Sequence, residues 1–499
     1  MLSLRQIFPL IASFAATASA CTPCTSLTLS NPPPGTSLIN ITSIERHDVT
    51  VTGTRFNGTG TVSNISFCDV EIYLTHGSSH DAVRIAVWLP LPIQKWTGRF
   101  MGTGGSGFRA GIFDPALAEG VADGFAATST DAGVGNAGDD PSSWAQNRQL
   151  VNNFVYLSIH EMTVVGKQVA EQFYGKKPTY SYFNGCSQGG RQGYRAALEY
   201  PDDYHGISAH SPGINWDRLL PGFLWPYLQK LQTPGLTTCK IAGITAASIA
   251  ACDPDDGAVD GLISYPPSCK FDATSLVGKE IAGCDVDKTI TKAEADAWNS
   301  IRDGPKYKSG KSIWYGMQPG SDISFVTLAP FAPGESWLKD FILRSPNYNT
   351  STLTYDDYLA DFAKSVKTFG QSWGSPSADL SAFKKRGGKL LTFHGWSDQS
   401  VPGESTIEYW NRVSQTVGGV DDFYRLFMAP GVGHCASFGY GPGPWSLMDT
   451  LVDWVEHGKA PDTLFAAGFG KTRNLCRYPK RLMYKGSSSV ENASSWTCI

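Results

Sequence analysis

The sequence predicts an α/β fold that is interrupted by a long insertion. Candidate strands and helices alternate up to about residue 210, a pattern typical of a parallel sheet covered by helices. Between residues 211 and 384 strands are hard to identify, and helical segments, cysteines and proline-rich loops replace them. The alternation then returns. We therefore expect an α/β domain in two parts, residues 21–210 and 385–499, with an inserted domain at 211–384.

The predicted elements follow from the spacing of apolar residues. Residues 21–75 alternate apolar and polar positions, which indicates short antiparallel strands. Apolar residues recur at helical spacing over 158–174, and shorter apolar runs indicate strands elsewhere. The expected elements after residue 75 are strands at 83–89, 99–101, 121–129, 180–184, 389–393 and 423–428, and helices at 158–174, 191–200, 404–417 and 445–457.

The first 20 residues have the organisation of a secretory signal peptide. Arg5 supplies the positive charge, residues 7–16 form an apolar core, and Ala18-Ser19-Ala20 suits signal peptidase. The apolar run is too short to span a bilayer. A lipoprotein signal with acylation of Cys21 is the alternative, but Ala18 stands where that signal has a leucine. We expect a secreted, extracellular protein.

One short motif suggests nucleophilic chemistry. Gly185-Cys186-Ser187-Gln188-Gly189 joins a predicted strand to a predicted helix and fits the G-x-S-x-G nucleophile elbow, in which a sharp turn exposes the serine oxygen. A Gly-Ser-Gly sequence is more often a plain turn. The functional interpretation therefore depends on finding a base, an acid and an oxyanion site elsewhere in the chain.

The acid and the base are found after two later strands. Asp398 follows the strand at 389–393 and His434 follows the strand at 423–428. The order Ser187, Asp398, His434 is that of hydrolases built on a parallel sheet, where sites form at the carboxyl ends of strands. These three residues are the predicted catalytic triad, in which the histidine activates the serine and the aspartate orients the histidine. The competitors for the acid and base roles are His394, Asp421 and Asp422.

Backbone amides are expected to stabilise the oxyanion. The residue after an elbow nucleophile, here Gln188, supplies one N–H group, and a glycine-rich loop after an earlier strand supplies the other. Gly102-Thr103-Gly104-Gly105 is the candidate loop, and Gly105 is the expected donor, with Gly104 as the alternative.

The chain has 11 cysteines, which in an exported protein indicates disulfides with one cysteine left over. Cys186 precedes the serine and Cys435 follows the histidine, so a bond between them is possible if the triad forms, whereas a buried free thiol is the alternative. Two further pairs are close enough in sequence to close local loops: Cys252 with Cys269, and Cys476 with Cys498.

Taken together, these motifs resemble the tannase and feruloyl esterase family, which pairs cysteines beside the serine and histidine. The matching segments are Gly185–Gly193, Tyr200–Gly206, Gly395–Asp398 and Gly433–Cys435. The resemblance spans nearly all of the mature chain. It implies an α/β-hydrolase domain with a large inserted lid. It also implies hydrolysis of hydroxycinnamate esters (ferulate, p-coumarate or caffeate) or of gallate esters.

The resemblance further implies a structural calcium ion in the lid, held in the loop that starts at Cys252. Carried over position by position, the ligands are the carboxylates and backbone carbonyls of Asp253, Asp256, Ala258, Asp260 and Leu262. Hard oxygen ligands on a glycine-containing loop suit calcium independently of the family. An acidic surface turn is the alternative. No organic cofactor is expected.

The charge composition limits the kinds of partner that the protein is expected to bind. With 41 basic and 45 acidic residues the net charge is −4, which gives no electrostatic case for binding nucleic acid or an anionic membrane. In a eukaryotic host, glycosylation sequons would direct glycans to the surface. The sequons begin at Asn40, Asn57, Asn64, Asn349 and Asn492.

The sequence thus predicts a secreted serine esterase that forms an acyl-enzyme on hydroxycinnamate esters of plant cell-wall polysaccharide such as xylan. The close alternative is a tannase acting on galloyl esters. The alternative from another class is an inactive hydrolase fold that serves as a binding protein, which the complete triad disfavours.

Overall fold

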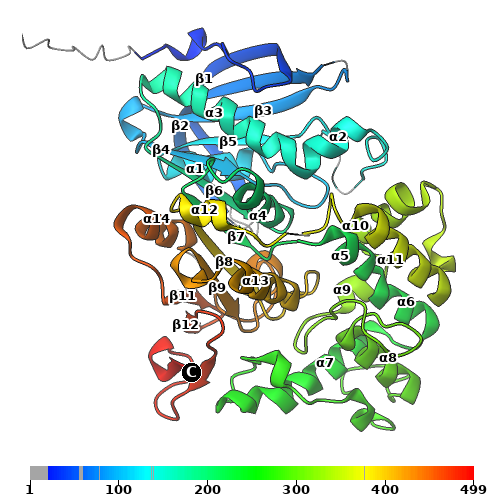
Figure 1. Cartoon of the computed structure of the whole chain (residues 1–499). Helices are drawn as coiled ribbons and strands as arrows, with labels where there is room; N and C mark the ends of the chain where they lie inside the picture. The colour runs from blue at the N-terminus through cyan, green and yellow to red at the C-terminus, as the bar shows by residue number, and fades with distance from the viewer. Residues whose placement is uncertain are drawn as a thin grey trace, which may run out of the picture.

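The computed structural model describes residues 21–499 except 55–59, 78, 136–137, 139, 376 and 445. The predicted signal peptide and the Asn57 sequon therefore lie outside the described residues. A nine-stranded sheet runs through the molecule in the order β1-β2-β3-β5-β4-β6-β7-β8-β9 (Figure 1). β1, β2, β3 and β5 pair antiparallel, and the remaining neighbours pair parallel. The strands are β1 Thr36–Thr54, β2 Gly60–His76, β3 Val83–Leu91, β4 Arg99–Thr103, β5 Phe125–Thr130, β6 Tyr180–Cys186, β7 Gly206–His210, β8 Lys389–Gly395 and β9 Tyr424–Ala429.

Helices cover both faces of the sheet and bury its alternating apolar side chains. On one face lie α3 (Ser158–Tyr174), α4 (Gln188–Glu199) and α13 (Gly403–Val417). On the other lie α1 (Asp114–Ala122) and α14 (Leu447–His457). The predicted helix at 158–174 is confirmed, and its periodic apolar residues are all buried. This sheet, covered by helices on both faces, has the architecture of the predicted α/β-hydrolase fold.

The segment between β7 and β8 contains helices and, among its described residues, no strand. Figure 1 shows most of these helices gathered beside the sheet, whereas α12 (Ser381–Lys385) lies against the sheet next to α4. They are α5 Trp216–Gly222, α6 Leu224–Gln232, α7 Thr238–Cys252, α8 Lys292–Asp303, α9 Ser324–Thr327, α10 Ala332–Ser336, α11 Tyr355–Phe369 and α12 Ser381–Lys385. Trp216, Trp337 and Trp373 from this segment pack with Phe108 and Phe154 of the preceding part, which holds the segment against the sheet. The domain boundaries at 210 and 385 stay a prediction.

Two sequence expectations about strands need correction. The N-terminal strands are not short: β1 and β2 have 19 and 17 residues and form one long hairpin. Register shifts at four places let the hairpin continue where the alternation of apolar residues breaks. Residues 121–124 are not strand, because α1 continues to Ala122 and Gly124 turns the chain with a φ of 77° before β5. Two small C-terminal sheets were not anticipated. One is formed by β10 (Gly443–Pro444), β11 (Thr463–Gly468) and β12 (Lys471–Cys476), and the other by β13 (Leu482–Tyr484) and β14 (Trp496–Cys498).

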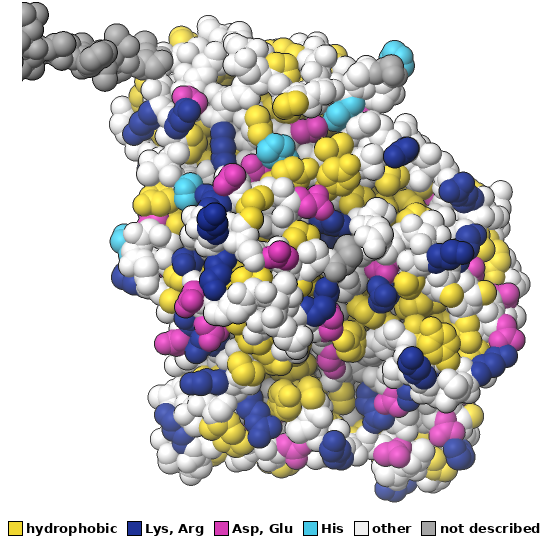
Figure 2. Space-filling view, viewed as in Figure 1, with side chains coloured by type: hydrophobic (Ala, Val, Ile, Leu, Met, Phe, Trp, Pro, Cys, Tyr) yellow, Lys and Arg dark blue, Asp and Glu magenta, His cyan; other side chains and the backbone are white. Residues whose placement is uncertain are grey.

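Basic and acidic side chains are interspersed over the face shown in Figure 2. Among the helices that the structure describes, none has the length and apolar character needed to cross a bilayer.

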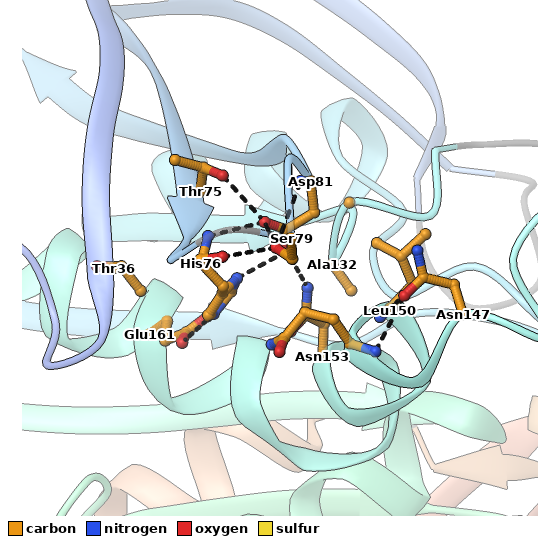
Figure 3. Close-up of polar contacts among 12 residues, drawn as sticks. Thr36, Thr75, His76, Ser79, Asp81, Ala132, Asn147, Leu150, Asn153 and Glu161 are labelled. Carbon is orange, nitrogen blue, oxygen red and sulfur yellow. Dashed lines mark hydrogen bonds and ion pairs between the residues drawn. The ribbon is translucent and has the colours of Figure 1, made fainter.

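A buried polar cluster ties the end of β2 to α3 (Figure 3). The His76 ring lies between two carboxylates, with Nδ1 2.7 Å from Asp81 Oδ2 and Nε2 2.8 Å from Glu161 Oε1. Asn153 Nδ2 donates to the same Asp81 oxygen at 2.7 Å. The hydrogen bond to Glu161 is the main cause that raises the pKa of His76 from 6.5 to about 9, although burial alone would lower it. The imidazolium therefore holds two buried carboxylates together at neutral pH.

This cluster predicts a loss of stability in mild alkali. Because the pKa of His76 is raised on folding, its contribution is complete below pH 6.5 and is lost as pH rises through about 9. We expect the free energy of unfolding to fall by about 3 kcal/mol across that range, and His76→Phe to remove this part of the pH dependence. Denaturant unfolding at several pH values measures it, with the exposed His47→Phe as control. An unchanged slope in His76→Phe would contradict the assignment.

Candidate active site

The predicted elbow is a sharp turn between β6 and α4. Ser187 has a positive φ of 59° with ψ −119°, a backbone conformation that is strained for a residue with a side chain. Neighbouring backbones approach too closely for side chains: a Cβ atom on Gly185 would lie 2.6 Å from the Gly189 carbonyl carbon, and one on Gly104 would lie 2.4 Å from Gly189 Cα. The glycines therefore permit a turn that presents Ser187.

The predicted acid and base come together at the ends of β8 and β9. His434 Nδ1 lies 2.7 Å from Asp398 Oδ2, and the other Asp398 oxygen accepts the N–H groups of Ser400 at 3.0 Å and Val401 at 2.8 Å. Burial alone would raise the pKa of Asp398, but its interactions with His434 and His394 outweigh burial and hold the pKa far below its usual range. Asp398 is thus an anion that orients the imidazole.

The competitors for these roles lie elsewhere. His394 is fully buried, and its ring nitrogens contact Thr406 Oγ1 at 2.8 Å and the Val401 carbonyl at 2.9 Å, with Asp398 Oδ2 at 3.3 Å. His394 therefore helps to hold the Asp398 carboxylate in place. Asp421 pairs with Arg477 at 2.5 Å. Neither aspartate of the Asp421–Asp422 pair contacts His434 in the described contacts.

One disulfide joins the two halves of the site, and four others close further loops. Cys186 and Cys435 are bonded, with an S–S distance of 2.04 Å and Cα atoms 5.9 Å apart, so Ser187 and His434 are joined covalently through their neighbours. The expected pairs Cys252–Cys269 and Cys476–Cys498 also form. The sequence left the other pairings open, and the structure bonds Cys24 to Cys68 and Cys239 to Cys284. Cys21 is the exposed free cysteine.

Ser187 and His434 line a common cavity of about 130 Å³. One side of the cavity is an apolar wall from the segment between β7 and β8, which the sequence could not specify, whereas Ser106, Gly107, Ser400 and Val401 line other parts of it. These wall residues are Trp216, Leu219, Leu220, Phe223, Phe331 and Pro333. Two larger clefts, of about 830 and 720 Å³, contain none of the three triad residues. The small cavity is therefore the one whose position suits the chemistry.

The two expected oxyanion donors differ in whether their backbone N–H groups are already hydrogen-bonded within the protein. Gln188 lines the cavity and begins α4, where backbone N–H groups are unpaired within the helix. Gly105 is a wrong prediction, because its N–H donates to Gln192 Oε1 at 2.9 Å. Gly104 and Ser106 also use their N–H groups, on the carbonyls of Asn184 and Arg109. Sequence spacing located the loop but could not show which amides the fold had already used.

Arg191 is a supporting residue that sequence reasoning missed. Its guanidinium is buried, donates to the Val155 carbonyl at 3.1 Å and to Gln188 Oε1 at 2.6 Å, and lies 5.2 Å from the centre of the Trp216 ring. Burial lowers its pKa to about 9. Arg191 thus links the elbow to the wall of the cavity. The Gly189-Gly190-Arg191 sequence was the available signal, but nothing local shows burial of the charge.

The predicted calcium loop gathers three carboxylates near one arginine. Asp253 accepts the Asp260 N–H at 3.2 Å and the Gly261 N–H at 2.9 Å, while Asp260 pairs with Arg473. Asp256 Oδ2 is buried without a hydrogen-bond partner. In the part of the chain that the structure describes, no group of three or more His, Cys, Asp or Glu side chains has the arrangement of a metal site. Calcium is therefore not confirmed.

The four described sequon asparagines are exposed, as a glycan would require. They are Asn40, Asn64, Asn349 and Asn492. The Asn349 side chain accepts from the Ser351 N–H at 3.1 Å, so this sequon opens a short helical turn. Occupancy of the sequons stays a prediction.

Comparison with known proteins agrees with this geometry. The family model described as tannase and feruloyl esterase matches residues 68–499. A probable feruloyl esterase of Arthroderma benhamiae is 37% identical over 99% of this chain and 97% of its own length. Feruloyl esterase B of Aspergillus niger is 32% identical over 88% of this chain and 87% of its own length.

Solved structures are similar over almost the whole chain. The crystal structure of feruloyl esterase B from Aspergillus oryzae superposes with a TM-score of 0.81 and 27% identity, covering 95% of this chain and 99% of its own. A tannin acyl hydrolase from Aspergillus niger superposes with a TM-score of 0.83 at 24% identity, covering 95% and 94%, and shows the shared fold alone. The chain therefore belongs to the tannase and feruloyl esterase family of carboxylic ester hydrolases.

Proposed function

We propose that this protein is a secreted feruloyl esterase that hydrolyses hydroxycinnamate esters of plant cell-wall polysaccharide. The observation that carries the choice of acyl group is the apolar wall of the catalytic cavity, formed by Trp216, Leu219, Leu220 and Phe223. A gallate ring brings three hydroxyl groups, which such a wall would leave without hydrogen-bond partners. A ferulate ring and its vinyl spacer bury well against it. The relatives named feruloyl esterase and the five disulfides support the same reading.

In the proposed mechanism, His434 removes the proton of Ser187 as the serine oxygen attacks the ester carbonyl. The 2.7 Å contact with Asp398 keeps the Nδ1 proton on the far side of the ring, so Nε2 is free to act as the base. His434 then gives the proton to the leaving alcohol. Water enters, is deprotonated by the same imidazole, and releases the phenolic acid from Ser187.

We propose Gln188 and Gly107 as the two oxyanion donors. Both line the cavity with Ser187. The earlier amides of the glycine-rich loop are used within the protein, whereas no acceptor for the Gly107 N–H is found among the described backbone contacts. Two amides fixed before the reaction cost little reorganisation when negative charge develops on the carbonyl oxygen.

The direct test compares turnover of methyl ferulate and methyl gallate by the purified enzyme. We expect kcat/KM for the ferulate to exceed that for the gallate by about 100-fold or more, since unpaired polar groups in an apolar site discriminate strongly. Preference for the gallate would make the protein a tannase. Absence of turnover on any small phenolic ester would favour the inactive binding protein, which the intact Asp398–His434 contact disfavours.

We also propose that the loop after α7 holds a structural calcium ion. Asp253, Asp256 and Asp260 bring three carboxylates together against a single arginine, Arg473, and leave one buried Asp256 oxygen unpaired. A divalent cation would balance the remaining charge and supply the missing partner. With the carbonyls of Ala258 and Leu262, these residues would hold the ion, and the Cys252–Cys269 bond closes the loop around it.

Calcium removal should therefore lower thermal stability. We expect a chelator to lower the melting temperature by about 5 °C, with recovery on adding calcium but not magnesium. Differential scanning calorimetry measures this. Asp256→Ala should lose the calcium response, whereas Asp255→Ala, an exposed neighbour, should keep it. A melting temperature insensitive to both chelator and calcium would show that this loop holds no structural calcium ion.

A further inference from the structure

Four aromatic side chains stand exposed on the surface beside the catalytic histidine. Phe325, Phe438, Tyr440 and Phe469 are 49%, 54%, 71% and 66% exposed, which is unusual for large apolar residues in one neighbourhood. We call them the aromatic strip. They come from three segments far apart in the sequence: α9, the turn after His434, and the turn that joins β11 (Thr463–Gly468) to β12 (Lys471–Cys476).

Ring contacts connect the strip to the catalytic cavity. Phe223 and Phe331, which line the cavity, have ring centres 4.9 Å apart, and Phe331 lies 5.1 Å from Phe325. Phe325 in turn lies 6.1 Å from Phe438. Beyond Phe438, Tyr440 follows after one residue and packs 6.4 Å from Phe469. Ring contacts therefore run from the cavity wall out to Phe438, and Tyr440 with Phe469 forms a second exposed pair two residues further along the chain.

The strip lies on the side from which the alcohol leaves. His434 protonates the leaving oxygen in the proposed mechanism, so the alcohol part of the ester must lie next to this ring. The turn that carries His434 also carries Phe438, because the Gly433 N–H donates to the Phe438 carbonyl at 2.7 Å. A chain attached to the departing oxygen would thus meet Phe438 and then Tyr440.

The chemistry of the strip indicates a neutral partner. The segments that form it, residues 323–334, 435–444 and 463–470, contain no Asp, Glu, Lys or Arg. These segments themselves offer a charged partner no counter-charge, whereas the C–H face of a sugar ring stacks on an aromatic ring without needing one. We propose that the aromatic strip is a binding subsite for the neutral glycan chain that carries the ester. This proposal rests on the feruloyl esterase function proposed above.

The test uses Tyr440→Ala with Phe469→Ala, two strip residues outside the cavity, and Tyr307→Ala, an exposed ring on a lid loop, as the matched control. For each protein, kcat/KM is measured on a feruloylated arabinoxylan fragment and on methyl ferulate. We expect the ratio of the first to the second to fall about tenfold in the strip variant and to stay unchanged in the control. An unchanged ratio in the strip variant would overturn the proposal.

A binding measurement separates this proposal from the catalytic one. Ser187→Ala protein is mixed with insoluble neutral xylan, with polygalacturonate, or with phosphatidylcholine vesicles. We expect binding to xylan that weakens about tenfold when the strip substitutions are added. Stronger binding to vesicles or to the anionic polymer, or no binding to xylan, would overturn the glycan assignment. Failure of the wild-type enzyme on methyl ferulate would instead refute the proposed function and leave the binding result to stand by itself.

Discussion

Replacing Ser187 by alanine should lower kcat on methyl ferulate by about 10⁵-fold while leaving the fold intact. The side chain makes no described hydrogen bond that stabilises the turn, and alanine removes only the oxygen that attacks the ester. The activity that remains in Ser187→Ala would come from substrate binding in the cavity and from the oxyanion amides. Steady-state kinetics measures the loss, and circular dichroism with a thermal melt verifies folding.

Ser106→Ala is the matched control, because Ser106 lines the same cavity but lies in the glycine-rich loop. We expect its kcat to change by less than about tenfold, since this oxygen has no covalent role. If Ser187→Ala kept more than a hundredth of wild-type activity in a preparation free of contaminating esterase, the nucleophile would have to be a different residue.

Replacing Asp398 by asparagine should lower kcat by about 10⁴-fold. The carboxylate accepts a hydrogen bond from the Nδ1–H group of His434 at 2.7 Å, whereas an amide can donate to that nitrogen and so stabilise the wrong tautomer of the ring. Because the pKa of Asp398 is held far below its usual range, ionisation of this group should not limit the wild-type rate at mildly acidic pH.

Kinetics as a function of pH measures the effect, with Asp421→Asn as control because Asp421 pairs with Arg477. We expect the control to retain activity within about twofold, as for other surface ion pairs. Comparable losses in the two variants would show that Asp398 acts through general stability and does not orient His434.

The sequence was sufficient to predict that Ser187, Asp398 and His434 meet at one site, because the signals for them are local. The elbow needs glycines around Ser187 wherever the strand ends, and Asp398 and His434 follow strands whose apolar runs are easily read. The cysteines added a long-range constraint: Cys186 and Cys435 lie 249 positions apart and still report that the serine and histidine are neighbours. Few sequence features carry such information about distant parts of the chain.

The remaining features depend on contacts that no local pattern encodes. The cavity wall combines Phe223 and Phe331, which come from different helical segments of the insertion. The burial of Arg191 depends on carbonyls that Phe154 and Val155 present from a π-helical turn. Gly105 looked like an oxyanion donor until the position of Gln192 showed that its N–H group was already used. Each case depends on tertiary packing rather than on sequence spacing.

The disulfide beside the triad explains how a strained turn and a loop can hold a precise geometry. Ser187 has a positive φ, and so does Cys435 next to His434, so both halves of the centre are locally unfavourable backbone. The bond between Cys186 and Cys435 fixes the two turns to one another at a Cα separation of 5.9 Å. The clamp therefore preserves the relative position of nucleophile and base on two otherwise separate loops.

In the proposed mechanism Ser187 forms a covalent ester with the hydroxycinnamoyl group, and this acyl-enzyme can be trapped. The enzyme is mixed with excess methyl ferulate, quenched in acid within milliseconds, digested and analysed by mass spectrometry. We expect a feruloyl group on the peptide that contains Ser187 in the wild-type protein, and none on the corresponding peptide of Ser187→Ala. A feruloyl group on any other residue, or turnover with no acyl-enzyme in wild-type protein under burst conditions, would contradict it.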